Sequence, residues 1–583
     1  MERRVLLAIF LAFLVLYVWQ ALFVKPVPKP GVPTAGTPAG AQASGQPAAG
    51  QRPAPSNAET PAPAAEKPVT PPPPVAAALV GETAERDVRI ETREIIAVFT
   101  NRGARLKSWR LKRYMNQNRE PQELVEHAIA SQPLPFTLRA SNDGTTTTLN
   151  TALYAVSGAP TGSAESSPVD LRFEYRDSAG LHASKAFHFE PDGFIVTAGV
   201  AVTQAERPLE TSIVWGPALG DVGEVSRYAT KAGGILFQDG SVVRVDASKV
   251  AKQPVYEGDF RYAGVEDNYF ITAALDIGPG KVTFQPVAIP PADPKGTARD
   301  LMSWTIESRE GSPAKFFVGP KDFDLLKAIN PDFAKAVNFG MWSVIVVPLL
   351  RSLKWVNGYV GNYGWSIVIL TFIINVILFP LRHKSVVSMR KMQEIQPEVK
   401  AIQDRYKNLK ATDPAKQKMN QELMALYKER GVNPASGCVP MLLTMPFILA
   451  FYALLSTAIE LRGAPWFGWI HDLSAHDPLF VTPVLMGASQ IWQQRLAPAA
   501  GMDPVQQKMT MLMPVFFTFL FLWYPAGVAL YWLVNNIWAI GQQYLTNYII
   551  GPPKTARAPG GSASERRMKR VGGSKTDAAR ENS

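Results

Sequence analysis

The apolar residues of this chain are unevenly spread, and they gather at the N-terminus and in the part after residue 339. Several of these runs have about the length that a helix needs to cross the hydrocarbon core of a bilayer. Only Tyr524-Pro525-Ala526-Gly527 separates the last two, which predicts a tight turn between antiparallel helices. With the N-terminal run, the pattern predicts six membrane spans. The five later spans are expected at 362–381, 440–459, 479–496, 509–523 and 527–549.

The N-terminal run, residues 1–24, begins with Arg3 and Arg4 and continues as a long apolar stretch. A cleavable signal peptide is the alternative, but its apolar core is usually ~7–15 residues long. This run is longer, and it ends near Trp19 and Phe23, aromatic residues that suit a membrane–water interface. We therefore expect a retained transmembrane anchor whose basic end lies in the cytoplasm.

The segment between the anchor and the later spans changes character twice. Residues 25–80 are rich in Pro, Ala and Gly, which predicts a disordered linker that cannot bury a core. Residues 81–320 then alternate apolar and polar positions, as in Lys185-Ala186-Phe187-His188-Phe189. Asn142-Asp143-Gly144 and Asp239-Gly240 have the chemistry of hairpin turns. We expect a large antiparallel β-sandwich domain here, and its acidic and His residues suggest no catalytic pair.

Residues 339–357 carry an apolar stripe at helical spacing, with Phe339 and Val346 among its members. Arg351 and Lys354 interrupt the apolar run. This combination suits an amphipathic helix that lies in the membrane interface and turns its basic face to the headgroups. A spanning helix is the alternative.

The formal net charge of +11 is concentrated in particular segments. The 382–436 loop and the 550–583 tail are rich in Lys and Arg, whereas the 460–478 loop has Arg462 as its only Lys or Arg. A basic balance can indicate nucleic-acid binding, but the positive-inside rule also explains this distribution. That rule puts the N- and C-termini in the cytoplasm and the β domain outside, in agreement with the anchor.

The basic 382–436 loop has a regular pattern of its own. Apolar residues recur every three or four positions on both sides of Asp413-Pro414, which predicts two amphipathic helices in an antiparallel hairpin. One interpretation is a solvated pair that only connects two spans. The other is that Met side chains in the seam offer adaptable apolar contacts to varied partners. These residues are Met389, Met392, Met419 and Met424.

Polar residues inside the expected spans lie mainly in their cytoplasmic halves, while the outer halves are almost entirely apolar. Interhelical hydrogen bonding is one explanation, worth only about 0.6 kcal/mol per contact. It gives no reason for the outer halves to be avoided, so we favour a hydrophilic pocket open to the cytoplasm. The candidate pocket residues are Asn375, Thr444, Ser489, Gln490, Thr510, Asn535 and Asn536.

No enzyme signature is visible in the sequence. It contains no P-loop, no His-Glu-x-x-His and no Gly-x-Ser-x-Gly, and no pair of carboxylates lies within a span. Cys438 is the single cysteine, so an internal disulfide is excluded, and the six His residues show no metal-ligand spacing. We expect no catalytic residue, no metal and no cofactor.

Several local segments are characteristic enough to indicate a family. The segments Gly361–Ser366, Val432–Pro434, Gly437–Pro440, Trp469–Leu473 and Leu522–Gly527 closely resemble the YidC membrane protein insertases, relatives of the mitochondrial and chloroplast insertases. The resemblance is specific from about residue 339 to residue 549. It extends more loosely to the anchor, linker and β domain, which look like the Gram-negative form.

The resemblance implies a five-helix core around a groove open to the cytoplasm and to lipid. It also implies an outer β-supersandwich domain like that of sugar-binding enzymes, without known catalysis. The family usually has an arginine in the groove, in the second span, where this chain has Asn375. Because an amide carries no charge, the attraction of acidic tails that a buried arginine would provide is in doubt here.

We therefore expect a multi-spanning protein of the bacterial inner membrane that inserts nascent membrane proteins, alone or with the Sec translocon. The groove would receive the polar part of the inserted protein, and the basic tail would attract the ribosome or anionic lipids. A secondary transporter that uses the same pocket is the alternative, although no charged coupling residues are visible at the midplane. A structural assembly factor that binds through its β domain is a third possibility.

Overall fold

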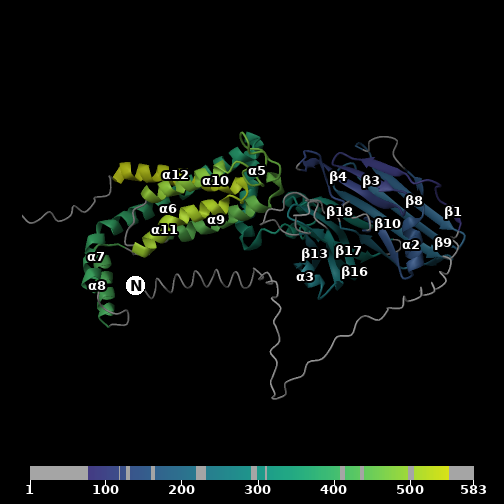
Figure 1. Ribbon diagram of the computed structural model, residues 1–583, viewed down its shortest axis with the longest axis horizontal. Helices are drawn as coiled ribbons and strands as arrows, with labels where there is room; N and C mark the ends of the chain where they lie inside the picture. The colour runs from purple at the N-terminus through teal and green to yellow at the C-terminus, as the bar shows by residue number, and fades with distance from the viewer. Residues whose placement is uncertain are drawn as a thin grey trace, which may run out of the picture. The chain divides into compact units, whose positions relative to one another are not determined.

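Strands fill the first part of the described chain and helices fill the rest (Figure 1). The computed structural model describes residues 77–116, 118–126, 132–158, 165–217, 232–289, 299–308, 312–406, 414–432, 439–496 and 504–550. The expected anchor at 1–24, the linker up to residue 76, Cys438 and the tail after residue 550 lie outside these residues.

The described strands of the β domain form a 14-stranded sheet and a 4-stranded sheet, and every pair in them is antiparallel. The main path of the large sheet is β1 (Ala78–Val80), β8 (Val169–Asp177), β9 (Leu181–Phe189), β10 (Ile195–Gln204), β18 (Ala314–Pro320), β16 (Phe270–Ile289), β15 (Val255–Glu266), β13 (Gly233–Gln238) and β14 (Ser241–Val245). Beside this path lie β6 (Thr137–Ala140), β7 (Ala155–Ser157), β11 (Arg207–Pro208), β12 (Thr211–Trp215) and β17 (Arg299–Glu307).

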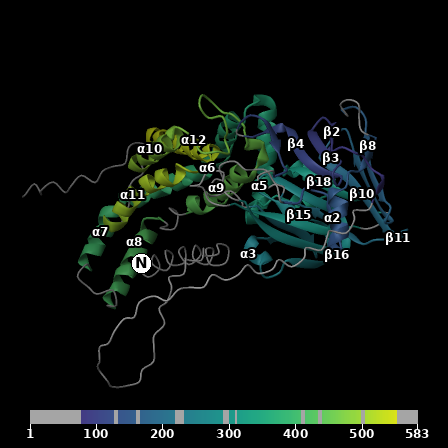
Figure 2. The same cartoon turned by 45° about the vertical axis from the view of Figure 1, so that its right-hand side comes forward.

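The small sheet has the order β2 (Asp87–Glu91), β3 (Ile95–Thr100), β4 (Arg105–Met115) and β5 (Pro121–Glu123). It lies against one face of the large sheet (Figure 2). The ring of Phe99 in β3 is 4.7 Å from that of Phe187 in β9, and Trp109 Nε1 donates to Val318 O in β18 at 3.0 Å. The expected antiparallel β domain is therefore confirmed, with an aromatic core between its sheets.

The alternating pattern in the sequence is the reason that these strands bury one face. Along β8 and β9, buried residues alternate with exposed or half-buried ones over the whole length of each strand. The turn predicted at Asp239-Gly240 is present, because both residues have positive φ and Gln238 pairs with Ser241. The expected linker is too long at its end, since Ala78–Val80 pairs with β8 as a strand.

The hairpin turn expected at Asn142-Asp143-Gly144 is wrong. Asn142 is instead the N-cap of α2 (Asp143–Thr151), and its side-chain oxygen accepts hydrogen bonds from the backbone N–H of Gly144 and Thr145. Asn serves helix caps as readily as turns, because in both its side chain replaces a missing backbone partner. The residue type therefore did not decide between the two. A second short helix, α3 (Ala247–Val250), is capped in the same way by Asp246.

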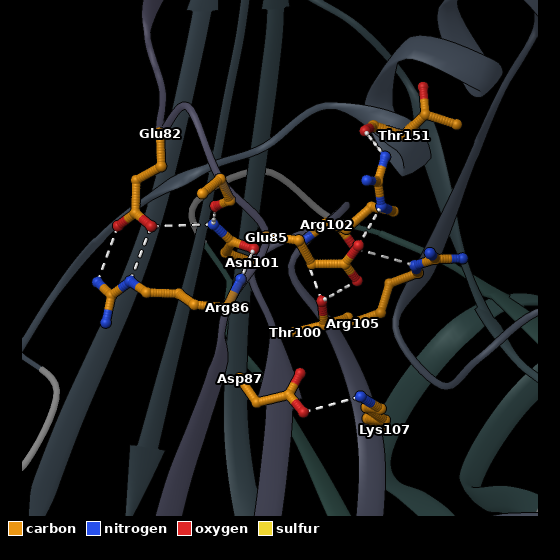
Figure 3. Close-up of polar contacts among 11 residues, drawn as sticks. Glu82, Glu85, Arg86, Asp87, Thr100, Asn101, Arg102, Arg105, Lys107 and Thr151 are labelled. Carbon is orange, nitrogen blue, oxygen red and sulfur yellow. Dashed lines mark hydrogen bonds and ion pairs between the residues drawn. The ribbon is translucent and has the colours of Figure 1, made fainter.

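The chain enters the β domain through a polar cluster that Figure 3 shows. Asn101, fully buried, donates to Glu82 Oε2 and Ala84 O, both at 2.9 Å, and accepts from the backbone N–H of Arg86 at 2.9 Å. An exposed ion pair between Asp87 and Lys107 lies nearby at 2.8 Å. Such exposed pairs contribute only about 0–1 kcal/mol each. The buried amide of Asn101 therefore connects Glu82, Ala84 and Arg86 of this entry segment to the start of the small sheet's second turn.

The helices that follow have the bounds α4 (Phe323–Ile329), α5 (Ser343–Val360), α6 (Tyr363–Glu394), α7 (Gln396–Arg405), α8 (Ala415–Glu429), α9 (Val439–Thr457), α10 (Val481–Leu496), α11 (Pro504–Phe521) and α12 (Ala526–Ile550). Short 3-10 turns are present at η1 (Phe333–Ala336), η2 (Gly340–Trp342) and η4 (Ile459–Leu461). By length and composition, one helix of the described residues, Tyr363–Met392, could cross a membrane, and the apolar helices Met445–Thr457 and Met511–Phe521 are shorter.

Helix α5 buries the apolar stripe that the sequence predicted, including Val346 and Leu353, while Trp355 and Tyr359 are exposed. Its basic residues differ from expectation. Lys354 does not turn away from the protein but forms ion pairs with Glu460, Asp322 and Asp324. Glu460, the most buried of these carboxylates, would be left without a counterion if Lys354 turned toward the headgroups, and an unpaired buried charge is costly.

Helix α6 continues beyond the predicted span end at residue 381, as one helix to Glu394. Pro380 lies inside it without ending it. Helices α6, α9, α10, α11 and α12 run alongside one another (Figure 1). Gly487 allows α10 and α11 to approach closely, since a Cβ there would collide with Thr518 Oγ1. This helical part contains every residue of the expected pocket.

Candidate functional site

A small polar cavity lies between α6, α9 and α12. Its volume is about 10 Å3 as seen by the centre of a water molecule, which is room for about one water. Polar and apolar side chains from all three helices surround it, and α6 supplies the largest share. The lining residues are Thr371, Ile374, Asn375, Leu378, Arg382, Phe447, Ile448, Tyr531 and Asn535.

The centre of this cavity is a hydrogen bond within α6. Arg382 Nη1 donates to Asn375 Oδ1 at 2.6 Å, and Asn375 Nδ2 in turn donates to Thr371 O at 2.8 Å. Asn375 is only 3% exposed. Its carbonyl and amino ends are both engaged, so its orientation is fixed by its neighbours on the same helix.

Arg382 is the residue that the sequence analysis missed, because it falls just beyond the predicted end of the second span. The seven-residue spacing between Asn375 and Arg382 could have indicated that the two side chains lie on the same face of the helix. Residues seven apart on a helix lie two turns apart on the same face, so Arg382 follows Asn375 directly along the helix surface. A long side chain can cover that distance, and Arg382 extends toward Asn375.

Ser489 and Asn536 lie at another junction, where α10 meets α12. Asn536 Nδ2 donates to Ser489 Oγ at 3.1 Å and to Met486 O at 3.2 Å. Ser489 Oγ donates to Met486 O at 2.7 Å. These contacts join two helices, which is the role of interhelical hydrogen bonds. Neither residue lines the cavity around Asn375.

The remaining expected pocket residues have different surroundings. Asn535 lines the cavity opposite α6 and is half-buried. Gln490 in α10 has a buried Oε1 with no hydrogen-bond partner among the described residues. Further along α12, Gln542 Nε2 and Thr546 Oγ1 are in the same state. Buried polar atoms without partners are unusual and are often satisfied by ordered water. The side chains of Thr444 and Thr510 lie outside the described residues.

The expected hairpin in the basic loop is represented by α7 and by α8, whose first half, up to Glu422, belongs to a separate compact unit. In the second half, Leu423 and Leu426 are buried, and Arg430, directly after α8, donates to Glu398 in α7 at 2.8 Å. The four Met residues have no common state: Met424 is 47% exposed, and Met392 and Met419 are half-buried. The side chain of Met389 lies outside the described residues.

The described residues that line the cavity include no His, Cys, Asp or Glu side chain. Within the described ranges, no group of three or more His, Cys, Asp or Glu side chains could hold a metal ion. The cavity lining includes one cation, Arg382, and two amides, Asn375 and Asn535, but no carboxylate. Such a set can bind polar or negatively charged groups by hydrogen bonding.

Two family models together match most of the chain. The model described as "60Kd inner membrane protein" matches residues 355–552, and the "YidC periplasmic domain" matches residues 87–352. "Active YidC insertase crystal structure with the first transmembrane domain resolved" describes a solved structure that is 17% identical, with a TM-score of 0.33. It covers 82% of this chain and 95% of that chain.

Two curated relatives match this chain over nearly its whole length. The membrane protein insertase YidC of Syntrophus aciditrophicus is 33% identical over 570 residues, covering 94% of this chain and 99% of that protein. The membrane protein insertase YidC of Pelobacter propionicus is 34% identical over 584 residues, covering 94% of this chain and 100% of that protein. The chain therefore belongs to the YidC family of membrane protein insertases, which are proteins of the bacterial inner membrane with a periplasmic domain.

Proposed function

We propose that this protein inserts nascent membrane proteins through a polar groove that opens to the cytoplasm between α6, α9 and α12. The observation that carries the proposal is the set of polar side chains around one cavity, in which Asn375 is buried and Arg382 and Asn535 are half-buried. Polar side chains at this depth are costly against lipid, so their presence needs a polar occupant or water. The relatives named insertase support the same function.

In this mechanism the polar part of a client protein leaves the cytoplasm and meets side chains in the groove instead of hydrocarbon. Its apolar part then moves sideways into lipid, where burial of apolar surface is favourable. The barrier for polar residues falls without nucleotide hydrolysis. The groove would extend along the inner halves of the spans and use Asn375, Thr444, Ser489, Gln490, Thr510, Asn535 and Asn536.

The surrounding parts of the chain would serve delivery. The cytoplasmic hairpin would receive clients on Met392, Met419, Met424 and Met389, because Met side chains adapt to varied apolar surfaces. The basic tail after Gly551 would bind ribosomal RNA or anionic lipid. Insertion would proceed alone or beside the Sec translocon. The proposed topology has six spans, with both termini in the cytoplasm. The proposed mechanism includes no catalytic step.

Site-specific photocrosslinking tests the groove directly. A crosslinker at residue 375 or 535 should capture a ribosome-stalled nascent membrane protein. The matched control is residue 355, because Trp355 is 62% exposed on α5, away from the cavity. Strong crosslinks from 355 with none from 375 or 535 would exclude insertion through this groove.

Deletion of most of the β domain separates insertion through the groove from the alternative of a structural assembly factor. If clients are inserted through the groove, the deletion should leave insertion largely intact, whereas an assembly factor that binds through the β domain should lose its function.

A further inference from the structure

The loop that joins α9 to α10, residues 460–478, contacts the start of α6. Asn362 Nδ2 donates to Trp466 O at 3.1 Å. The ring of Trp466 packs directly on Gly364, where a Cβ would collide with it. Because α6 leads into the basic hairpin at its other end, the loop lies at the end of this helix away from the hairpin. We call residues 460–478 the outer loop.

The outer loop also contacts the start of α12. Ala526 N donates to Ala475 O at 2.7 Å, and Gly527 N donates to Leu473 O at 2.9 Å. The first N–H groups of a helix have no partner within the helix, so these two loop carbonyls supply acceptors that α12 itself lacks. Leu473 is fully buried, and Ile470 of the same loop is 2% exposed. The loop is therefore packed onto the helix ends and not merely strung between them.

Apolar side chains separate the outer loop from the polar cavity around Asn375. Ile367 in α6, Leu454 in α9 and Val528 in α12 are at most 3% exposed, and they belong to the same packed cluster as Leu473. In each of the three helices, this apolar residue lies between the outer loop and the residues that line the cavity. An ion needs water or polar groups along its path, and an apolar layer offers neither. A path for ions through the cavity would therefore end at this layer.

Asp477 fixes the last part of the outer loop. Its side chain is buried, and each of its carboxylate oxygens accepts two hydrogen bonds. Oδ1 accepts from Trp469 Nε1 at 2.9 Å and from Leu479 N at 3.0 Å. Oδ2 accepts from Thr482 N at 2.7 Å and from Thr482 Oγ1 at 2.5 Å. Asp477 therefore connects the middle of the loop, through Trp469, to the first turn of α10, through Thr482.

The four donors around Asp477 require a carboxylate. Among the described residues, no cation pairs with Asp477, so these N–H and O–H groups are what compensates its burial. An amide at position 477 would offer a single carbonyl oxygen, and its NH2 group would face donors that need an acceptor. Replacement of Asp477 by Asn, although nearly the same size, should therefore free either Trp469 or the start of α10.

We propose that the outer loop is a seal that prevents ions from crossing the helical part of the protein, and that Asp477 is the positioning residue that keeps this seal closed. The inference rests on the proposed polar groove, because a groove that takes up water from one side must be closed at the other if the membrane is to stay impermeable. It adds a barrier function to the insertion function and assigns that barrier to Asp477 and its contact with Trp469.

Potassium flux across vesicles that contain the full chain tests the seal. Asp477→Asn should raise the flux by about tenfold or more, because loss of one buried acceptor corresponds to a change of that order in an equilibrium constant. Trp469→Phe keeps an aromatic ring and removes one donor, so a smaller increase is expected. The matched control is Asp472→Asn, because the Asp472 carboxylate accepts from Ser474 within the loop. This control should show the wild-type flux.

A cysteine probe shows whether the flux arises at the seal. In a Cys438→Ser background, Val528→Cys places the protein's single thiol in the apolar layer, where Val528 is buried. A membrane-impermeant thiol reagent is added on the side of the outer loop. It should leave the thiol unmodified when Asp477 is present and should modify it in the Asp477→Asn variant. Protease resistance of the purified variants checks that each of them folds.

The outcomes separate the seal from the insertion function. A folded Asp477→Asn variant with wild-type flux and a protected thiol would overturn the role of Asp477, and so would an equal flux from Asp472→Asn. If Asp477→Asn does not fold, Trp469→Phe decides by the same two measurements. Client insertion without an applied membrane potential should change little in Asp477→Asn. If the wild-type protein is impermeable to ions but inserts no client, the proposed insertion function fails while the seal stands.

Discussion

Lys354 Nζ lies 2.7 Å from Glu460 Oε1, and this ion pair joins α5 to the 3-10 turn that follows α9. The side chain of Glu460 is 8% exposed. Burial raises the pKa of Glu460, and the charge of Lys354 works in the opposite direction. Burial also disfavours the ammonium of Lys354, but Glu460, Asp324 and Asp322 outweigh it and raise its pKa. The charged form of each side chain is therefore stabilised by the opposite charge of its partner.

Removal of the cation should leave Glu460 buried without a partner. We expect Lys354→Met to lower the free energy of unfolding at neutral pH by about 3 kcal/mol, the cost typical of a broken buried pair. As pH falls, a carboxyl whose pKa is raised in the folded state becomes protonated in the native protein at a higher pH than in the unfolded chain. The deficit should therefore shrink as pH falls through that pKa toward the unfolded value of 4.5.

Thermal unfolding in detergent at neutral and at mildly acidic pH measures this effect. The matched control is Lys354→Met with Glu460→Gln, which removes the buried charge and should recover much of the stability at neutral pH. A deficit that stays the same at both pH values would contradict the assignment to Glu460.

Lys185 stabilises the β domain in an unusual way for a lysine. It is fully buried, and its Nζ donates to Gly103 O at 2.6 Å, to Phe136 O at 2.7 Å and to Ala104 O at 3.2 Å. Burial lowers the pKa of Lys185, but the three acceptors match the three donors of an ammonium group.

Lys185→Met keeps a similar length but leaves three carbonyl groups without this donor. We expect a loss of about 3 kcal/mol, because each buried unsatisfied group costs about 1–3 kcal/mol and partial rearrangement offsets some of the sum. Protease resistance of the β domain in the full chain measures it. The matched control is Lys315→Met, because Lys315 is exposed on β18 and should be tolerated. Equal resistance of the two variants would show that the buried hydrogen bonds contribute little.

Asn375→Asp tests the contact between Asn375 and Arg382 in α6 by changing the acceptor. A carboxylate at this position would bind the guanidinium of Arg382 more strongly than the amide does, so the fold should be retained. The variant should therefore be at least as stable as the wild-type protein. Thermal unfolding of the variant and of the wild-type protein in detergent measures this. A clearly lower unfolding temperature for the variant would contradict a direct contact between residue 375 and the guanidinium of Arg382.

The cytoplasmic hairpin should be essential for client delivery. Deletion of 389–430 with a short linker should abolish insertion while the membrane helices stay folded, because α9 to α12 pack through their own buried residues. A milder change, Met424→Ser, removes an exposed apolar contact and should weaken client crosslinking without a loss of stability. Full insertion by the deletion variant would refute the role of the hairpin.

The basic tail should bring the ribosome close. Truncation after Gly551 removes several Lys and Arg residues, and ribosome association should weaken, most clearly at low salt, where electrostatic attraction is strongest. Co-sedimentation of the purified protein with ribosomes over a range of salt concentrations measures this. Unchanged co-sedimentation at low salt would contradict the prediction.

The sequence by itself determined the elements of this protein. Periodicity is a local property, so alternation of apolar and polar residues predicted strands such as β8 and β9, and the long apolar runs predicted α6, α9, α10, α11 and α12. Local chemistry failed where one residue type serves two structures, as Asn142 did at the start of α2.

Only the tertiary structure decided which polar groups meet. Asn375 and Asn536 looked alike in the sequence, yet the first holds Arg382 beside a cavity while the second ties α12 to α10. Similarly, Lys354 looked like a headgroup contact until the fold brought Glu460 to it. Contacts of this kind depend on helix length, rotation and the reach of long side chains, and these follow from packing between segments far apart in the chain.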